Sequence, residues 1–224
     1  MRQMERDTTV EPQIGTVLID FGGVIAEEGF MNGLRYMAKE QDLDPDTVFH
    51  EAVEIMYSCG YLVGKAQEST FWNTLAERTG LNGDQAAKRE ALLSRFIVRP
   101  RMLEIVAMLA AQGRQVAMLS DQTDWLDALN EKYEIFPYFH RVFNSYHEGM
   151  HKRQPEFFHH ALEELGATAE LALFIDDSAR HVALARELGL AAIHFDTLAQ
   201  VERELGEILP DMKPLLEQPP YCRP

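Results

Sequence analysis

Residues 14–26 read IGTVLIDFGGVIA, an apolar and β-branched run that is stopped by two adjacent glycines. A continuous apolar run predicts a strand that is buried on both faces, and the glycine pair predicts a tight turn at its end. Asp20 lies where the run meets this turn. We therefore expect a buried strand with a carboxylate at its carboxyl end.

Later segments repeat this signal and alternate with helical patterns. Proline lies near the start of two of the intervening helices and glycine just past the end of three, as expected for helix boundaries. An alternating β/α order of this kind predicts a parallel, doubly wound sheet. The further strand candidates are VAMLS (116–120), RVFNS (141–145), LALFID (171–176) and AAIHF (191–195), and the boundary residues are Pro100, Pro155, Gly113, Gly166 and Gly189.

Residues 27–98 interrupt that order, because they show helical spacing and no convincing strand. Phe30, Leu34 and Met37 repeat at i, i+4 and i+7, as do Phe49, Val53 and Met56 behind an Asp44-Pro45 helix start. Two more helices are expected over about 69–79 and 84–96. This block is either a cap over a site or a helical subdomain that only packs.

The expected fold class is therefore α/β, with a Rossmann-like doubly wound parallel sheet core and an inserted all-helical cap. We expect the core to comprise residues 14–26 and 99–212, and the cap to comprise residues 27–98. Residues 1–13 and 213–224 are expected to be flexible ends.

Composition narrows the classes of partner. The chain has 224 residues and a formal net charge of −15, which argues against nucleic acid and anionic membrane partners. Two cysteines, Cys59 and Cys222, are too few for a disulfide framework. No stretch is apolar enough for a membrane span or a signal core, so we expect a cytoplasmic protein. The oligomeric state is not visible in the sequence.

Polar residues follow several of the expected strands. In an open parallel sheet, ligands bind beyond the carboxyl ends of the strands, where Asp20, Ser120 and the Asp176-Asp177 pair would lie. Lys152 follows the strand candidate at 141–145 and can reach the same edge. Taken singly, these residues also fit a turn, two helix caps and a solvated lysine. Together they would require four coincidences in order.

Four segments in order carry a resemblance to a known family: LIDFGGV, MLSD, SYHEGMHKRQPEFF and FIDDSARHV. They resemble the signature regions of the haloacid dehalogenase superfamily, and the resemblance covers about residues 14–198. It implies a hydrolase of the phosphatase-like branch, with a helical cap inserted after the first strand.

The resemblance also implies a role for each matching residue. Asp20 would be the nucleophile, while Ser120 and Lys152 would hold the transferring group. Mg²⁺ would be bound by Asp20, the backbone carbonyl of Gly22 and Asp177. Such a site suits phosphoryl transfer, because a carboxylate can accept a phosphoryl group only where cations neutralise the gathered negative charge.

Supporting residues are expected around this set. Asp176 would orient Lys152 or the metal ligands, and Asp121 completes the MLSD segment. Arg153 stands where the family usually has another residue and can add a phosphate contact. His181 stands where the family often has Asn or Asp, and we expect a buried, satisfied histidine there.

Gly22 is the main departure from the family pattern. Related phosphatases usually carry an aspartate two positions after the nucleophile, and this aspartate protonates the leaving oxygen. A general acid is typically worth about 10²–10⁴ in rate, so its absence slows turnover or moves protonation to water or to a cap residue. Binding of the metal would not suffer, since only the backbone oxygen of residue 22 is needed.

Residues 147–151 read HEGMH and match the HExxH pattern of zinc proteases. That site needs both histidines on one face of a stable helix, whereas Gly149 disfavours a helix by about 1 kcal/mol relative to Ala. We therefore reject a zinc site at His147 and His151.

The sequence thus predicts a Mg²⁺-dependent phosphatase that acts on a small phosphorylated metabolite, with a sugar phosphate as one candidate. Two alternatives remain open. A metal-independent 2-haloacid dehalogenase would not need the missing acid, and a non-catalytic regulatory protein would bind a phosphate ester without turnover.

Overall fold

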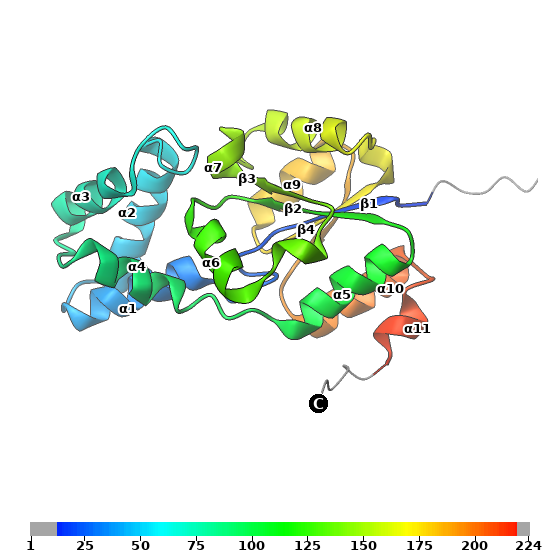
Figure 1. The fold of residues 1–224 in the computed structure, drawn as a ribbon, viewed down its shortest axis with the longest axis horizontal. Helices are drawn as coiled ribbons and strands as arrows, with labels where there is room; N and C mark the ends of the chain where they lie inside the picture. The colour runs from blue at the N-terminus through cyan, green and yellow to red at the C-terminus, as the bar shows by residue number, and fades with distance from the viewer. Residues whose placement is uncertain (1–12, 219–224) are drawn as a thin grey trace, which may run out of the picture.

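The computed structural model describes residues 13–218, and its core is a five-stranded, fully parallel sheet (Figure 1). The strand order is β3-β2-β1-β4-β5, so the first strand lies at the centre. Ile19 of β1 pairs in register with Met118 of β2 and Ile175 of β4, which brings the carboxyl ends of these three strands together. The strands are β1 (Thr16–Ile19), β2 (Gln115–Ser120), β3 (Arg141–Asn144), β4 (Ala172–Asp176) and β5 (Ala191–His194).

Helices cover both faces of the sheet. Successive strand residues point to opposite sides, so the apolar strands expose apolar side chains on both faces that must be buried. Val17 and Ile19 join a core that includes side chains of α5, α6 and α10, whereas Leu18 joins a second core with α8 and α9. The bounds are α5 (Pro100–Ala111), α6 (Trp125–Tyr133), α8 (Pro155–Glu164), α9 (Ala179–Glu187) and α10 (Leu198–Ile208). Shorter helices are η1 (Phe136–Tyr138), α7 (Ser145–Glu148), η2 (Ala169–Leu171) and α11 (Lys213–Leu216).

Four helices lie between β1 and α5 and form a separate group beside the sheet (Figure 1). The side chains of Asp44 and Asp84 accept hydrogen bonds from the first turns of two of these helices, and Gly80 ends a third with φ +80°. The four helices are α1 (Gly29–Glu40), α2 (Pro45–Ser58), α3 (Glu68–Thr79) and α4 (Gln85–Leu93). The doubly wound parallel sheet with a helical insertion is confirmed. The division of the chain at residues 27 and 98 stays a prediction.

The carboxyl-terminal segment differs from expectation. We predicted flexibility from residue 213 onward, but residues 213–216 form α11 and Leu216 is buried. Arg101 explains the difference, because its Nη2 donates to the carbonyl oxygen of Leu216 at 2.9 Å and its Nε donates to Glu202 at 2.6 Å. Residues 1–12 and 219–224 of the expected flexible ends, Cys222 among them, lie outside the described residues, and Cys59 is a free thiol. No helix within residues 13–218 is long and apolar enough to cross a bilayer.

The loop after β1 is fixed by one side chain from the other end of the insertion. Nη1 of Arg99 lies 2.8, 2.9 and 2.6 Å from the carbonyl oxygens of Gly23, Val24 and Ala26. Buried carbonyl oxygens in a loop need such a donor, because leaving a buried acceptor unpaired costs about 1–3 kcal/mol of folding free energy. Arg99 therefore stabilises the turn that follows Asp20.

Replacing Arg99 with methionine should lower the free energy of unfolding by about 1–3 kcal/mol, because the three carbonyl oxygens lose their charged donor. Chemical denaturation measures this change. Arg203→Met is the control, since Arg203 is mostly exposed on α10 and its loss should change stability by less than about 0.5 kcal/mol. Equal effects of the two substitutions would contradict the role given to Arg99.

Candidate active site

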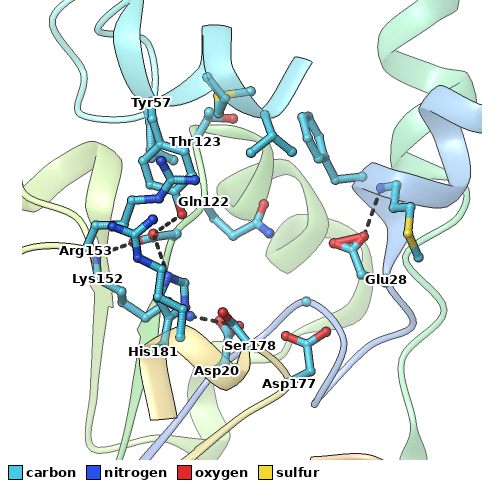
Figure 2. A pocket seen from close by; sticks show the side chains of 18 of the residues that line it. Asp20, Glu28, Tyr57, Gln122, Thr123, Lys152, Arg153, Asp177, Ser178 and His181 are labelled. Atoms are coloured by element: carbon cyan, nitrogen blue, oxygen red, sulfur yellow. Dashed lines mark hydrogen bonds and ion pairs between the residues drawn. The ribbon is translucent and has the colours of Figure 1, made fainter. Parts of the chain in front are cut away.

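The residues expected at strand ends meet at one edge of the sheet. Figure 2 shows Asp20, Lys152 and Asp177 of this set. Asp20 directly follows β1, Ser120 is the last residue of β2, and Asp176 is the last residue of β4. Asp177 follows Asp176, and Lys152 comes from the loop between α7 and α8. The structure thus brings all five side chains together.

Hydrogen bonds and an ion pair hold both oxygens of the Asp20 carboxylate. Oδ1 accepts from the Ser120 hydroxyl at 2.6 Å and from the backbone N–H of Phe21 at 2.7 Å. Oδ2 lies 2.8 Å from Nζ of Lys152. Since Ser120 and Lys152 are almost completely buried, these contacts are shielded from water. Ser120 therefore does not cap a helix, and α6 begins only at Trp125.

Lys152 is a buried cation between two carboxylates. Its Nζ also donates to Oδ2 of Asp176 at 2.6 Å. Burial alone would lower the pKa of Lys152, but the charges of Asp176 and Asp20 outweigh burial and raise this pKa above its usual range. Lys152 in turn holds the pKa of Asp176 below the usual range against the effect of burial. The ammonium and the Asp176 carboxylate are both ionised at neutral pH.

Asp177 has the features of a metal ligand. One carboxylate oxygen from each of Asp20, Asp176 and Asp177 lies within 4.8 Å of the others, the only such acidic, histidine or cysteine group among residues 13–218. The oxygens of Asp176 already accept from Lys152 and from the backbone N–H of Ser178. Burial and the nearby charges of Asp20 and Asp176 raise the pKa of Asp177. A divalent cation bound between these carboxylates would relieve their mutual repulsion.

The backbone after Asp20 allows this close approach. Gly23 has φ +78°, and a Cβ atom there would lie 1.8 Å from Oδ2 of Asp177. Glycine is therefore required at this turn, both by conformation and by space. The three carboxylates fit Mg²⁺, which prefers oxygen ligands.

The position of the missing acid is bordered by another carboxyl group. Gly22 has no side chain, but a Cβ atom there would lie 3.8 Å from Oε1 of Glu28 and 3.3 Å from Nε2 of Gln122. Oε2 of Glu28 accepts from the backbone N–H of Met31 at 2.8 Å and so begins α1 (Figure 2). Burial raises the pKa of Glu28 to about 7. Its carboxyl group is therefore partly protonated at neutral pH.

Asp121 joins the helical insertion to the loop that carries Lys152. Its Oδ2 accepts from the Tyr57 hydroxyl at 2.6 Å, and its Oδ1 accepts from the backbone N–H of Lys152 at 2.8 Å. The guanidinium of Arg153 stacks on the Tyr57 ring, 3.4 Å from its centroid. Nδ1 of His181 lies 3.4 Å from Oδ1 of Asp176 but forms no hydrogen bond, so this histidine is buried as expected but not fully satisfied.

The HEGMH pattern forms no helix that would place two histidines together. α7 ends at Glu148, and Gly149 adopts φ +71°. His147 instead lies 2.8 Å from Asp127, and Glu148 lies 2.9 Å from His160. This geometry supports the rejection of a zinc site made from the sequence.

Glu28, Tyr57 and Gln122 are among the residues that line the site and were not expected from the sequence. Gln122 follows the MLSD segment directly, so its position beyond β2 was a usable signal. Glu28 and Tyr57 resemble ordinary helix residues, and no sequence signal separates them from their neighbours.

The fold and the site together define an α/β protein whose polar side chains lie at the carboxyl edge of a Rossmann-like sheet. Residues 14–189 match the family model of haloacid dehalogenase-like hydrolases, and the chain belongs to this family. It is therefore a hydrolase of that family.

Sequence relatives include a phosphatase and a flavin mononucleotide hydrolase. The chain is 29% identical to sesquiterpene phosphatase astK of Aspergillus oryzae over 61% of the chain and 71% of the relative. It is 24% identical to a chloroplast flavin mononucleotide hydrolase of Arabidopsis thaliana, over 58% of the chain and 53% of the relative. The chain thus spans about half the length of the second relative.

Solved structures share the fold. A HAD family enzyme of Bacteroides thetaiotaomicron in complex with magnesium and inorganic phosphate aligns with a TM-score of 0.64 and 21% identity, over 84% of this chain and 98% of that one. L-2-haloacid dehalogenase of Xanthobacter autotrophicus aligns with a TM-score of 0.62 and 20% identity, over 95% and 92%.

The raised pKa of Glu28 gives a prediction for stability. Because the folded protein keeps this proton up to about pH 7 and the unfolded chain loses it near 4.5, the unfolding free energy of the wild type falls as the pH rises through this window. Glu28→Gln removes this loss. In metal-free buffer, the variant should match the wild type near pH 4 and exceed it by about 1–3 kcal/mol at pH 8.

Denaturation curves across this pH range measure the difference. Glu27→Gln is the matched control, because Glu27 is the adjacent residue and its side chain is about half exposed. A difference between Glu28→Gln and the wild type that does not change with pH would show that Glu28 is ionised throughout.

Proposed function

We propose that the chain is a Mg²⁺-dependent phosphatase that hydrolyses a small phosphomonoester through an aspartyl-phosphate on Asp20. The observation that carries the proposal is the Asp20 carboxylate at the end of β1, held by Ser120 and Lys152 with Asp177 beside it. The names of two relatives, a sesquiterpene phosphatase and a flavin mononucleotide hydrolase, support the same reaction.

In the first step, a carboxylate oxygen of Asp20 attacks phosphorus and the bond from phosphorus to the alcohol oxygen breaks. The buried Lys152 ammonium and the Ser120 hydroxyl stabilise the charge on the phosphoryl oxygens. Water then attacks the aspartyl-phosphate, which releases phosphate and restores Asp20. Mg²⁺, held by Asp20, Asp177 and the Gly22 carbonyl oxygen, would neutralise negative charge in both steps.

In this proposal, the supporting residues position the catalytic side chains. Asp176 orients the Lys152 side chain, and Asp121 fixes the Lys152 backbone and connects it to Tyr57. His181 faces Asp176, and Arg153 offers a second cation at the rim of the cavity.

Glu28 takes the position of the proton donor in this proposal. The oxygen of its carboxyl group that does not accept from Met31 borders the empty side-chain position of Gly22. This oxygen would give its proton to the leaving alcohol oxygen, and the resulting carboxylate would take a proton from the water that attacks in the second step. The same two steps therefore return the proton to Glu28.

Asp20→Asn should abolish phosphate release from an aryl phosphate in Mg²⁺ buffer, because the amide cannot form the covalent intermediate. Released phosphate is measured with and without a chelator. Asp46→Asn is the control, since Asp46 is an exposed residue of α2 and should leave activity unchanged. Activity retained in Asp20→Asn would refute the mechanism.

Glu28→Gln should affect substrates according to their leaving group. Hydrolysis of a simple alkyl phosphate needs a proton on the leaving oxygen, so its kcat should fall by about 10²-fold or more. Nitrophenolate leaves without a proton, so hydrolysis of p-nitrophenyl phosphate should fall by less than about tenfold.

Gly22→Asp in the Glu28→Gln background should restore part of the alkyl phosphate activity, because the new carboxyl group enters the same space. Glu27→Gln again serves as the control. Equal losses on the two substrates would remove Glu28 from the reaction and leave it the role of a helix cap.

The two alternatives make different predictions. A 2-haloacid dehalogenase would release halide in the presence of a chelator, but the acidic residue Asp177 beside Asp20 has no use in such a reaction. A binding protein would retain phosphate esters without hydrolysis, but the intact Asp20, Ser120 and Lys152 set favours turnover.

A further inference from the structure

We propose that the substrate is the phosphate ester of an apolar alcohol, with an aliphatic body rather than a sugar. This inference rests on the proposed phosphatase function and concerns the same site. It is carried by the chemistry of the cavity wall that lies opposite the Asp20 carboxylate.

The cavity between the helical insertion and the sheet edge has a volume of about 390 Å³, which suits a small molecule. The insertion lines it mainly with apolar side chains from α1, from one face of α2 and from the turn after α2. Trp125 of α6 extends this wall on the core side. The apolar residues from the insertion are Phe30, Met31, Phe49, Val53, Met56 and Leu62.

Charge and apolar surface are separated within the cavity. The charged groups near the reacting atoms, among them Asp20, Lys152 and Asp177, lie at the sheet edge, and Arg153 lies beside them. This separation fits a ligand with an anionic head and an apolar body.

The insertion contributes only two polar side chains to the wall, those of Glu28 and Tyr57, whereas the polar residues Thr123, Ser178, Arg180 and His181 come from the sheet side. The Tyr57 hydroxyl already donates to Asp121, and one oxygen of Glu28 already accepts from Met31. The remaining oxygen of Glu28 and the Gln122 amide lie beside Gly22, close to the phosphate end of the cavity. The hydroxyl groups of a sugar would therefore face apolar side chains, and each unpaired hydroxyl group weakens binding by about tenfold or more.

The apolar wall is partly open to solvent and is available to a ligand. Phe30, Met31, Phe49 and Val53 are only partly buried, although they line the cavity. Covering such side chains with an aliphatic chain removes apolar surface from water on both partners, which favours binding. The sugar phosphate considered from the sequence is therefore the less suitable candidate.

Binding of n-alkylphosphonates tests this inference, because these ligands keep the anionic head and cannot be hydrolysed. Calorimetric titration of the full chain in Mg²⁺ buffer measures the dissociation constant from ethyl- to octylphosphonate. We expect the dissociation constant to fall about fourfold per added methylene group until the cavity is filled. The phosphonate analogue of a hexose phosphate should bind at least tenfold more weakly than hexylphosphonate.

A matched pair of variants localises the effect. Val53→Thr keeps the shape of the side chain and places a hydroxyl group in the wall, so it should weaken octylphosphonate binding by about 2–5-fold and leave ethylphosphonate binding nearly unchanged. Val63→Thr is the control, because Val63 is also partly buried but does not line the cavity. It should change neither.

Dissociation constants that do not depend on chain length, or tighter binding of the sugar analogue, would overturn the apolar-alcohol inference. Phosphate release from aryl and alkyl phosphates separately tests the proposed function. Chain-length-dependent binding without any phosphate release would support the apolar cavity and refute the phosphatase. Release of phosphate with no chain-length dependence of binding would support the phosphatase and refute the apolar-alcohol inference.

Discussion

The site depends on one buried contact, the ammonium of Lys152 between the carboxylates of Asp20 and Asp176. Removing a cation from water is costly, and this position is stable only because two carboxylates lie within 2.8 and 2.6 Å of it. The contact connects the ends of β1 and β4 to a loop that follows β3. It also leaves Asp177 as the carboxylate that is not neutralised, which is the charge that a metal ion would balance.

The geometry around Gly22 and Gly23 shows how the two glycines differ in importance. Gly23 has no room for a side chain, since a Cβ atom would collide with Asp177. Gly22 is less restricted, and its open position is bordered by Glu28 and Gln122. Loss of a side chain at residue 22 therefore does not leave the site without a carboxyl group. The neighbouring Glu28 comes from the start of α1, so the insertion contributes to the chemistry that we propose as well as to the cavity wall.

The helical insertion and the sheet edge line the cavity with different kinds of side chain. Burial and hydrogen bonds hold the charged residues at fixed positions on the sheet edge, whereas the side chains from α1 and α2 present apolar surface. In the function that we propose, this division assigns the covalent step to the core, and proton donation by Glu28 and the choice of alcohol to the insertion. Tyr57 and Asp121 connect the two parts through one hydrogen bond, so the position of α2 is tied to the backbone of Lys152.

Much of this arrangement was predictable from local sequence. Asp20, Ser120 and Asp176 end apolar runs, and the carboxyl ends of parallel strands meet at one edge, so their proximity followed from the strand pattern. The helix start at Asp44 was likewise predictable, because capping depends on residues within one turn. The tertiary structure alone decided that residues 213–216 fold into α11 and that Glu28 lies beside Gly22. It also decided which face of α2 points toward the cavity. These features depend on contacts between residues far apart in sequence, such as Arg101 with Leu216, and no local pattern encodes the orientation of one helix against a distant strand.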